Sequence, residues 1–544
     1  MSVRAPGEWS DETWPGRWGR VENLDPRTIA FAREQLGPPT PAPQPDFLAV
    51  AASRWSEGQC SQLFPGVSAS VRDDIRARCA RGMSYVDLLT WRGDGELRAP
   101  DAVVFPDSHE QCALVVEVCA REGIAVIPFG GGTSVTGAVN TPTTSPSGVI
   151  ALSTQRMNSV MGFDEESAMA HVGAGITGPS LQAALPEWTL GHFPQSWERA
   201  SIGGFIAARS SGQASGGYGR IEDMVVSARL ATPIGTWDVG GFPASSQGPD
   251  LRQLVLGSEG TLGVVTSAHL RMRERPKFRD FGAAIIPGDF AQAAGVAREL
   301  TRSPLRPTIL RISDAAETDA MVTMSLPSGI AGSALRNYLR WRGARNGSLI
   351  ILGWEHTRAA TLAAARAYAK DVLAEHFAVW LGARPGRSWE RGRFHGPYLR
   401  DALVDAGYLV ETFETVSPWS NLTALHHSVS AVAAEALGER SYVMAHISHT
   451  YETAASLYFT VLAGGWSDPH DSARRWIEVK RTITDALVAA GGAVSHHHGV
   501  GRDHRGWLPH QLGPVGIDVL KAVKAALDPT GVMNPGALIE GVGR

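Results

Sequence analysis

The sequence contains little cysteine and no excess of charge. Only four of its 544 residues are cysteine, at positions 60, 79, 112 and 119, too few to staple a chain of this length, and this points to a reducing compartment. Fifty basic residues oppose 54 acidic ones, so a formal charge of -4 gives no reason to expect nucleic acid or an anionic surface as partner. We therefore expect a cytoplasmic protein that binds a small ligand.

Long apolar runs are also missing. The first residues, MSVRAPGE, lack the apolar centre of an export signal, and no run of about 18 apolar residues follows them. The sequence thus predicts neither export nor a membrane span. Its hydrophobic content of 43% is nevertheless enough to bury the cores of two or three domains.

The N-terminal part, residues 1–95, is predicted to be a helical segment. It has short helical patterns at 26–35 and 68–81, separated by a proline-rich run at 37–46 that we expect to be an extended linker. Residues 96–276 differ, because short β-branched runs alternate there with glycine-rich turns. This pattern predicts a domain with strands at 102–105, 124–127, 149–152, 168–172, 225–231 and 263–267.

Residues 277–500 alternate strands with alanine-rich helices and are predicted to form a second domain, a cap with an antiparallel sheet. A last segment, residues 501–544, contains a helix expected at 515–527 and is predicted to return to the first domain. The predicted fold class is therefore α+β.

A glycine-rich loop after a predicted buried strand is the clearest chemical motif. It reads Pro128-Phe-Gly-Gly-Gly-Thr-Ser134. Three glycines can turn successive N–H groups into one concavity that accepts a pyrophosphate, and Thr133 and Ser134 add hydroxyl donors. An ordinary glycine turn is the alternative. An NAD site is disfavoured, because the loop is not G-x-G-x-x-G and no acidic residue follows at the expected distance.

Other motifs place this loop in a family pattern. Pro100-Asp-Ala-Val-Val-Phe-Pro, Ala174-Gly-Ile-Thr-Gly178, Ile202-Gly-Gly204 and Gly257-Ser-Glu-Gly-Thr-Leu-Gly263 resemble, in type and order, the PCMH-type FAD-binding domain of the vanillyl-alcohol oxidase family. Within that family, Tyr218-Gly-Arg-Ile-Glu-Asp223, Glu411-Thr-Phe-Glu-Thr415 and Ser495-His-His-His-Gly-Val-Gly501 are similar to motifs of the alkylglycerone-phosphate synthases. The resemblance extends from about residue 85 to the C-terminus.

The resemblance implies an FAD site built from three loops. Its pyrophosphate would be held by Pro128, Phe129, Gly130, Gly131, Gly132, Thr133 and Ser134. The flavin ring and ribityl chain would be lined by Gln195, Ser196, Trp197, Glu198, Arg199, Ala200, Ser201, Gly203, Gly204, Ala208, Arg209, Ser210 and Ser211. The adenine side would be completed by Glu259, Gly260, Thr261, Leu262, Gly263, Val264 and Val265. Some relatives carry a histidine for covalent attachment where this chain has Thr133, so we expect non-covalent FAD.

The histidine motif also suits acid–base chemistry on its own terms. Histidine titrates near neutral pH and can give or take a proton. We expect no metal at His496, His497 and His498, because neighbours in an extended strand point to opposite faces and only the first and third share a side. Without the resemblance, surface or core histidines would explain the histidine motif equally well, and a core tyrosine would be the better explanation of Tyr458.

The resemblance assigns catalytic roles to these residues. Tyr458 would transfer a proton, and His496, His497 and His498 would give acid–base assistance to the leaving acyl group. Among the substrate-binding residues, Arg400 would hold a phosphate, which a guanidinium fork suits, and Arg311 would support the site. His446 stands where the family has an arginine. That exchange removes a permanent charge and is consistent with a different anionic headgroup.

The implied activity is a transfer. The acyl chain of acyl-dihydroxyacetone phosphate would be replaced by a fatty alcohol to form an ether lipid precursor, with no net oxidation and with FAD as a covalent handle. The same resemblance implies a lipid substrate, a homodimer, peripheral contact with a membrane and no nucleic-acid partner.

Two alternatives compete with this interpretation. One is an FAD-linked oxidase or dehydrogenase of a 2-hydroxy acid or related alcohol, whose metal-using members carry His-x-Gly-Asp-Gly-Asn-x-His. Here the corresponding stretch reads His446-Ile-Ser-His-Thr-Tyr451. The other is a binding protein without activity, which would be expected to have lost the polar cap residues that this chain retains.

Overall fold

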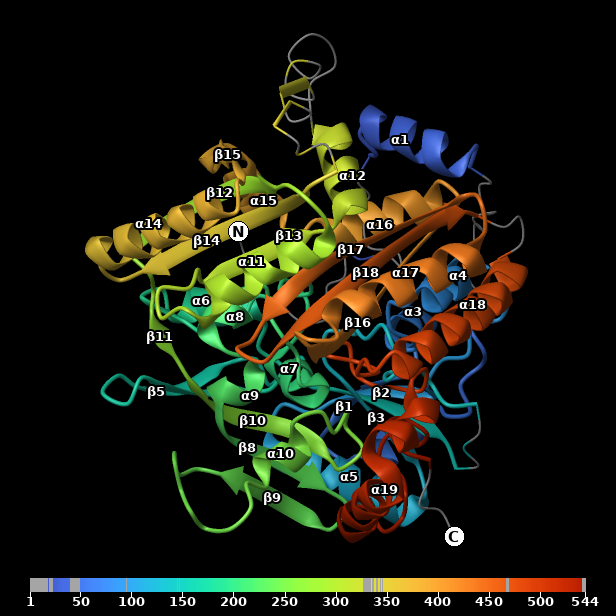
Figure 1. Cartoon of the computed structure of the whole chain (residues 1–544). Helices are drawn as coiled ribbons and strands as arrows, with labels where there is room; N and C mark the ends of the chain where they lie inside the picture. The colour runs from blue at the N-terminus through green and yellow to red at the C-terminus, as the bar shows by residue number, and fades with distance from the viewer. Residues whose placement is uncertain are drawn as a thin grey trace.

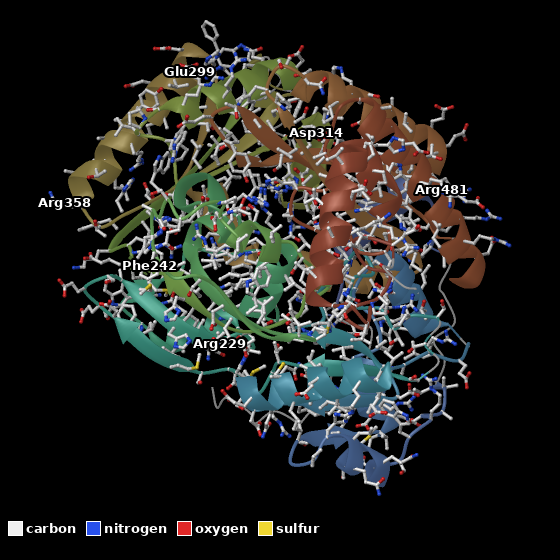
Figure 2. The ribbon with its side chains drawn as sticks, turned by 90° about the horizontal axis from the view of Figure 1, so that it is seen from below. Arg229, Phe242, Glu299, Asp314, Arg358 and Arg481 are labelled. Carbon is white, nitrogen blue, oxygen red and sulfur yellow. The ribbon has the colours of Figure 1, made fainter. Side chains whose placement is uncertain are left out.

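The computed structural model describes residues 18, 23–39, 49–93, 95–143, 145, 147–325, 334, 337–338, 341–342, 344, 346–465 and 469–540. These form an α+β protein in which two smaller sheets lie below one large sheet (Figure 1). The predicted fold class is confirmed. Glu299, Arg358 and Arg481 lie at the rim of the molecule, whereas side chains fill the space between the layers (Figure 2).

The first small sheet carries the glycine loop. Its strand order is β1 (Ser68–Ser70), β2 (Ala102–Phe105), β4 (Val149–Ser153) and β3 (Ala125–Phe129), with β2, β4 and β3 parallel. Helix α5 (His109–Glu122) begins at the Ser108 cap, ends at Gly123 in the left-handed conformation, and packs on β3. The glycine loop follows β3 directly, as the sequence predicts.

The second small sheet is antiparallel. Its order is β5 (Val160–Asp164), β6 (Met169–Gly173), β10 (Val264–Arg271), β8 (Val225–Thr232) and β9 (Gly235–Gly240). Helix α5 also contacts β8 and β10, so it joins the two small sheets through a shared apolar layer. Short helices, among them α7 (Ile202–Ala208), connect the strands on the side that faces the large sheet.

The large sheet has seven antiparallel strands. Their order is β15 (Val379–Gly382), β12 (Phe278–Ile286), β14 (Ser348–His356), β13 (Ile309–Ser313), β17 (Ser441–Thr450), β18 (Ala454–Gly464) and β16 (Tyr408–Pro418). Helices α11 (Phe290–Arg302) and α17 (Leu422–Leu437) cover one face, where Ala445, Ile447 and Phe459 are buried (Figure 1). Side chains alternate along a strand, so His446 and Tyr458 project from the opposite face.

The C-terminal segment contacts the glycine-loop sheet. Helix α18 (Pro469–Ala489) is followed by α19 (Leu508–Leu527), after which Met533 bridges Val126 of β3. Lys524 is buried at the end of α19 and donates to the carbonyls of Thr261 and Met533 and to the carboxylate of Asp528. The end of the chain is thereby tied to the loop that precedes β10.

Two local predictions were wrong. The helix expected over residues 68–81 is strand β1 followed by α3 (Asp73–Arg78), because residues 68–70 pair with β2 and this tertiary pairing overrides the local pattern. The helix expected from residue 515 begins at Leu508 and continues across a kink at Gly513, whose φ of 69° suits glycine. Residues 40–46 of the predicted linker lie outside the described residues.

Among the described residues, no helix is both long enough and apolar enough to cross a membrane.

Candidate active site

The glycine loop fits a diphosphate. Within the described part of the chain, the backbone N–H groups of residues 130–134 donate to no backbone or side-chain acceptor. A Cβ atom added at Gly131 would lie 2.1 Å from the carbonyl oxygen of Arg199, so only glycine permits this approach. Five free N–H donors, three of them on glycines that leave room for a ligand, suit a pyrophosphate.

The three loops predicted to hold FAD converge on one place. A Cβ at Gly130 would meet Ser201 Oγ at 2.3 Å, and one at Gly260 would meet Pro128 at 2.7 Å. The N–H of Glu259 donates to the carbonyl of Ala207 over 2.9 Å. The structure therefore brings together the three loops predicted to bind the cofactor, at residues 128–134, 195–211 and 259–265, and these residues suit FAD.

The cap contacts the segment predicted to line the flavin ring. The indole of Trp197 stacks on Phe394, with centroids 5.4 Å apart, and Tyr398 donates to the carboxylate of Glu198 over 3.0 Å. Arg209 takes a left-handed conformation after α7 and leads into Ser210, whose hydroxyl is 2.7 Å from the buried His192. The remaining predicted residues, Leu262 to Val265, lead into β10.

A row of polar side chains crosses the face of the large sheet that α11 and α17 leave uncovered. Tyr458 on β18 lies directly between His446 on β17 and Glu414 on β16 in the strand register. The rings of His446 and Tyr458 stack with centroids 5.0 Å apart. Burial raises the pKa of Tyr458 to about 12, so its phenol is protonated at neutral pH and can donate.

His446 belongs to a hydrogen-bonded triad that the sequence did not reveal. Arg311 Nη1 is 3.0 Å from His446 Nε2, and both residues bond to Oε1 of Glu317, at 2.7 Å and 3.1 Å. Because a guanidinium can only donate, His446 Nε2 accepts and its Nδ1 carries the proton. Burial opposes ionisation of Glu317, but Arg311 and His446 bring its pKa down to about 2.

Arg400 approaches the same row from helix α16 (Gly396–Asp405). It is buried, with one amino group 3.8 Å from the carboxylate of Glu411 and with its Nε without a partner among the described residues. Its charge acts on Tyr458, where it opposes the effect of burial on the phenol pKa. An arginine with a free donor beside Tyr458 is suited to an anionic substrate group.

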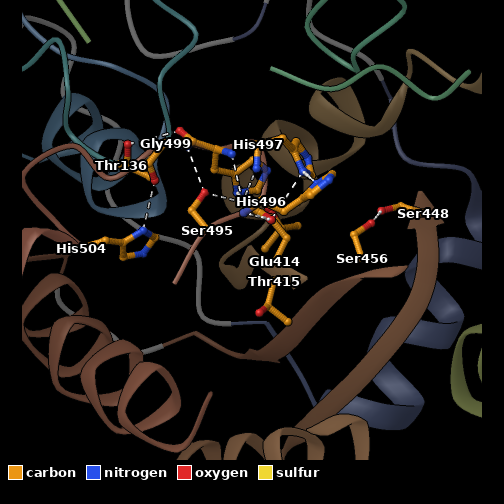
Figure 3. Close-up of polar contacts among 12 residues, drawn as sticks. Thr136, Glu414, Thr415, Ser448, Ser456, Ser495, His496, His497, Gly499 and His504 are labelled. Atoms are coloured by element: carbon orange, nitrogen blue, oxygen red, sulfur yellow. Dashed lines mark hydrogen bonds and ion pairs between the residues drawn. The ribbon is translucent and has the colours of Figure 1, made fainter. Parts of the chain in front are cut away.

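The three histidines lie on an irregular turn, residues 495–501, which we call the histidine turn (Figure 3). The expectation of an extended strand was wrong, because the N–H groups of His496, His497 and His498 all converge on the carboxylate of Glu414 (Figure 3). Burial disfavours this charge, but His497 and the other histidines hold the pKa of Glu414 well below its usual range. Glu414 is thus a buried carboxylate under the turn.

The histidine turn faces Tyr458. The ring centroids of His497 and His498 are 6.0 Å and 5.6 Å from that of Tyr458. Burial lowers the pKa of His498 to about 3, so this imidazole is neutral and can accept a proton only from a strong donor. The predicted catalytic residues therefore share one cluster with His446.

His496 lies slightly apart from Tyr458, next to two residues that the sequence analysis did not assign. Its Nε2 is 2.7 Å from the hydroxyl of Tyr451, and its Nδ1 is 3.0 Å from Nδ1 of His497. His449 completes a group of three imidazoles whose ring nitrogens lie within 4.8 Å of one another. Burial, and then the neighbouring imidazoles, hold the pKa of His449 and His496 well below the usual value.

Sequence reasoning missed Glu414, Glu317, His449 and Tyr451 as parts of the site. The motif Glu411-Thr-Phe-Glu-Thr415 carried a signal, since two glutamates within a strand that is otherwise buried need partners. The sequence around Glu317 carried no such signal, because its ion-pair partners, Arg311 and His446, lie on other elements.

Comparison with known proteins agrees with this architecture. Residues 100–239 match the family model of an FAD binding domain, and residues 277–538 match that of the FAD linked oxidases, C-terminal domain. The predicted FAD cofactor and flavoprotein family are confirmed by these matches.

Similar proteins span nearly the whole chain. The alkyldihydroxyacetonephosphate synthase of Dictyostelium discoideum is 33% identical, over 97% of this chain and 86% of its own length. That of Trypanosoma brucei brucei is 31% identical, over 86% of this chain and 78% of its own length. A solved alkyldihydroxyacetonephosphate synthase superposes with a TM-score of 0.78 at 29% identity, over 94% of this chain and 92% of its own.

Proposed function

We propose a function from one premise, that this chain belongs to the alkyldihydroxyacetonephosphate synthase family. Its reaction exchanges the fatty acid of acyl-dihydroxyacetone phosphate for a long-chain alcohol. The bond between C1 and the acyl oxygen breaks, a bond from the alcohol oxygen to C1 forms, and the alcohol proton leaves with the fatty acid. Nothing is oxidised or reduced overall.

One observation carries this proposal: the protonated Tyr458 lies among His446, His497 and His498, with the charge of Arg400 beside it. FAD held by the three loops would supply a nucleophilic ring position for the exchange at C1. Such a reaction needs a proton donor beside C1, and the protonated phenol of Tyr458 can serve as one. It also needs an anchor for the phosphate, and Arg400 offers a buried guanidinium with a free donor.

The remaining polar residues have supporting roles in this proposal. The Arg311, Glu317 and His446 triad fixes the ring that stacks on Tyr458. His497, whose Nδ1 is 3.5 Å from the carboxylate of Glu414, can take up the alcohol proton and return it to the departing carboxylate, while the neutral His498 can accept a hydrogen bond. Because His446 replaces a family arginine, we propose that the headgroup is held chiefly by Arg400.

An anaerobic assay tests the proposal. The yellow protein is mixed with palmitoyl-dihydroxyacetone phosphate and a labelled long-chain alcohol while the visible absorbance of the flavin is recorded. We expect labelled ether product and no net reduction of the flavin, whose absorbance is that of the oxidised form once the substrate is consumed. Bleaching of the flavin by a 2-hydroxy acid, with no ether formed, would instead establish the FAD-linked dehydrogenase alternative.

We also propose that FAD is bound without a covalent bond, since Thr133 occupies the loop position of the attachment histidine in some relatives. Acid precipitation should then release all flavin into the supernatant; flavin retained in the pellet contradicts the proposal.

We propose a cytoplasmic homodimer that contacts membranes peripherally to reach its lipid substrate. The four cysteines are free and buried, which fits a reducing compartment. Sedimentation velocity should give twice the chain mass of 58.0 kDa, and a monomer would refute the dimer. Flotation with lipid vesicles tests the membrane contact, and a protein that stays in the dense fractions would refute it.

A further inference from the structure

The peptide groups of the histidine turn are bound by two buried carboxylates from different parts of the molecule. Glu414, on strand β16 of the large sheet, accepts from the N–H groups of His496, His497 and His498 at 2.7, 3.1 and 2.9 Å. Glu259, in the loop before β10, accepts from the N–H groups of residues 500 and 501 at 2.5 and 2.7 Å. Five of the six N–H groups from residue 496 to residue 501 thus have carboxylate acceptors, and Gly499 is the exception.

The rest of the turn is bonded to side chains as well. Ser495 Oγ donates to Glu414 over 2.7 Å and accepts from the N–H of Gly499 over 3.0 Å. Arg220, from the FAD-binding half, donates to the carbonyl of His496 over 2.9 Å. Thr136, labelled in Figure 3, donates to the carbonyl of His498 over 3.4 Å.

Side chains therefore accept the peptide hydrogen bonds that backbone carbonyls accept in a helix or a sheet. A buried peptide N–H must find an acceptor, and an ionised acceptor makes a shorter and stronger bond than a neutral one. Glycine is needed at position 499, where φ is +88° and a Cβ would lie 2.8 Å from the carboxylate of Glu259. The shape of the turn is thus set by the two carboxylates.

We propose that Glu414 and Glu259 are positioning residues that clamp the histidine turn between the large sheet and the FAD loops, so that His497 and His498 face Tyr458. Neither carboxylate needs to touch the substrate. Because Glu259 belongs to the loop that completes the flavin site, the clamp links the geometry of the catalytic histidines to that of the cofactor loops. The kinetic part of this inference rests on the proposed function; the structural part does not.

Isosteric variants provide the test. Glu414→Gln and Glu259→Gln keep the volume of the side chain but replace a charged acceptor by an amide, whose NH2 group cannot accept. Glu355→Gln is the matched control, because Glu355 is also buried in the large sheet but bonds to Tyr218 and Arg279 instead of the turn. All three variants replace a buried carboxyl group by an amide, and only the first two touch the clamp.

Hydrogen exchange of the FAD-loaded protein gives a readout that does not depend on activity. In the unaltered chain, the amides of residues 496–501 should be protected although they lie in no helix or strand. Glu414→Gln should accelerate exchange at residues 496–498 first, and Glu259→Gln at residues 500 and 501 first, by about tenfold or more. Glu355→Gln should leave all of them unchanged. Equal exchange in all four proteins would overturn the clamp.

The kinetic readout separates positioning from general damage. We expect kcat of Glu414→Gln to fall by about 10- to 100-fold with KM changed less than threefold, because the histidines are displaced while the substrate anchor at Arg400 stays. Glu414→Asp keeps the charge and should recover part of that loss. A rise in KM with unchanged kcat would make Glu414 a binding residue and overturn the proposal.

The double variant tests whether both carboxylates act on one turn. If they do, the double variant Glu414→Gln with Glu259→Gln should lower kcat by less than the product of the two single reductions. The reason is that the first substitution already displaces the histidine turn, so the second displaces it little further. Multiplicative losses would show two independent effects. If the proposed transferase activity is absent, the exchange experiment still decides the clamp by itself.

Discussion

Single residues set the geometry of the cofactor loop, and Gly131 has the tightest requirement. Its α-carbon faces the backbone of Arg199, and a Cβ there would be 2.1 Å from a carbonyl oxygen that cannot rotate away. Gly162 provides a contrast, because nothing lies within 4 Å of a Cβ added to it.

We therefore predict that Gly131→Ala weakens FAD binding and that Gly162→Ala does not. Forcing the two loops apart should cost about 1–3 kcal/mol, which corresponds to a loss of flavin affinity of roughly 5- to 150-fold. Titration of the apoprotein with FAD, followed by flavin fluorescence, measures the difference. Equal affinities in the two variants would show that the approach of the loops is unrelated to cofactor binding.

Residue patterns alone could identify the loop but not the clamp. The glycines follow a strand in the sequence, so the motif and its structural context are local and both were predictable. Glu414 lies 82 to 84 positions from the N–H groups that it accepts from, and Glu259 lies 241 positions from Val500. No periodicity encodes such pairs, because they depend on how distant elements pack.

Among the elements, α19 and the segment after it determine how the end of the chain closes on the FAD loops. Lys524 is 4% exposed, and Nζ bonds to Thr261 O over 2.7 Å and to Met533 O over 2.6 Å. Its carboxylate partner, Asp528, is fully buried and also accepts from the N–H groups of Val532 and Met533. The Lys524–Asp528 ion pair therefore joins helix α19 to the residues that follow it and to the loop that contains Thr261.

Lys524→Met should destabilise the protein by about 3–5 kcal/mol, because it leaves the buried carboxylate of Asp528 without its cation. Lys521→Met, on the exposed side of the same helix, is the control and should have little effect. Denaturant unfolding monitored by circular dichroism gives both values. A loss below about 1 kcal/mol in Lys524→Met would mean that water replaces the ammonium group.

The elements themselves were predictable to different degrees. Strands β2 and β4 matched because their apolar runs are bounded by turn residues. Strand β1 was missed because its residues pair with β2 only after the chain between them has folded. The kinked start of α19 was missed because Gly513 and Pro514 resemble a helix terminus.

At the scale of the whole molecule, buried neutral histidines should govern the stability in acid. Burial lowers the pKa of His192 and His498 to about 3 and that of His504 to about 4, all from 6.5 in the unfolded chain. Between these values the unfolded chain binds more protons than the folded one. The stability is therefore fully present above pH 6.5 and decreases as the pH falls below it.

We expect the melting temperature to fall steadily as the pH is lowered from about 7 to about 5, with each histidine contributing on the order of 1 kcal/mol per pH unit. Burial also raises the pKa of Glu259 to about 7 and that of Asp401 and Glu411, which acts in the opposite direction, but the pKa values of more histidines are lowered, His446, His449 and His496 among them. His192→Asn should flatten the curve. A melting temperature that stays constant over this range would show that these histidines are protonated in the folded protein.

Above all, we propose that this flavoprotein joins an alcohol to C1 of acyl-dihydroxyacetone phosphate without redox turnover. The decisive measurement counts ether formed and fatty acid released per enzyme, under nitrogen, while the flavin absorbance is followed. We predict equal amounts of ether and acid over many turnovers with the flavin oxidised throughout. Acid released without ether, or turnover that stops when the flavin is reduced, would contradict it.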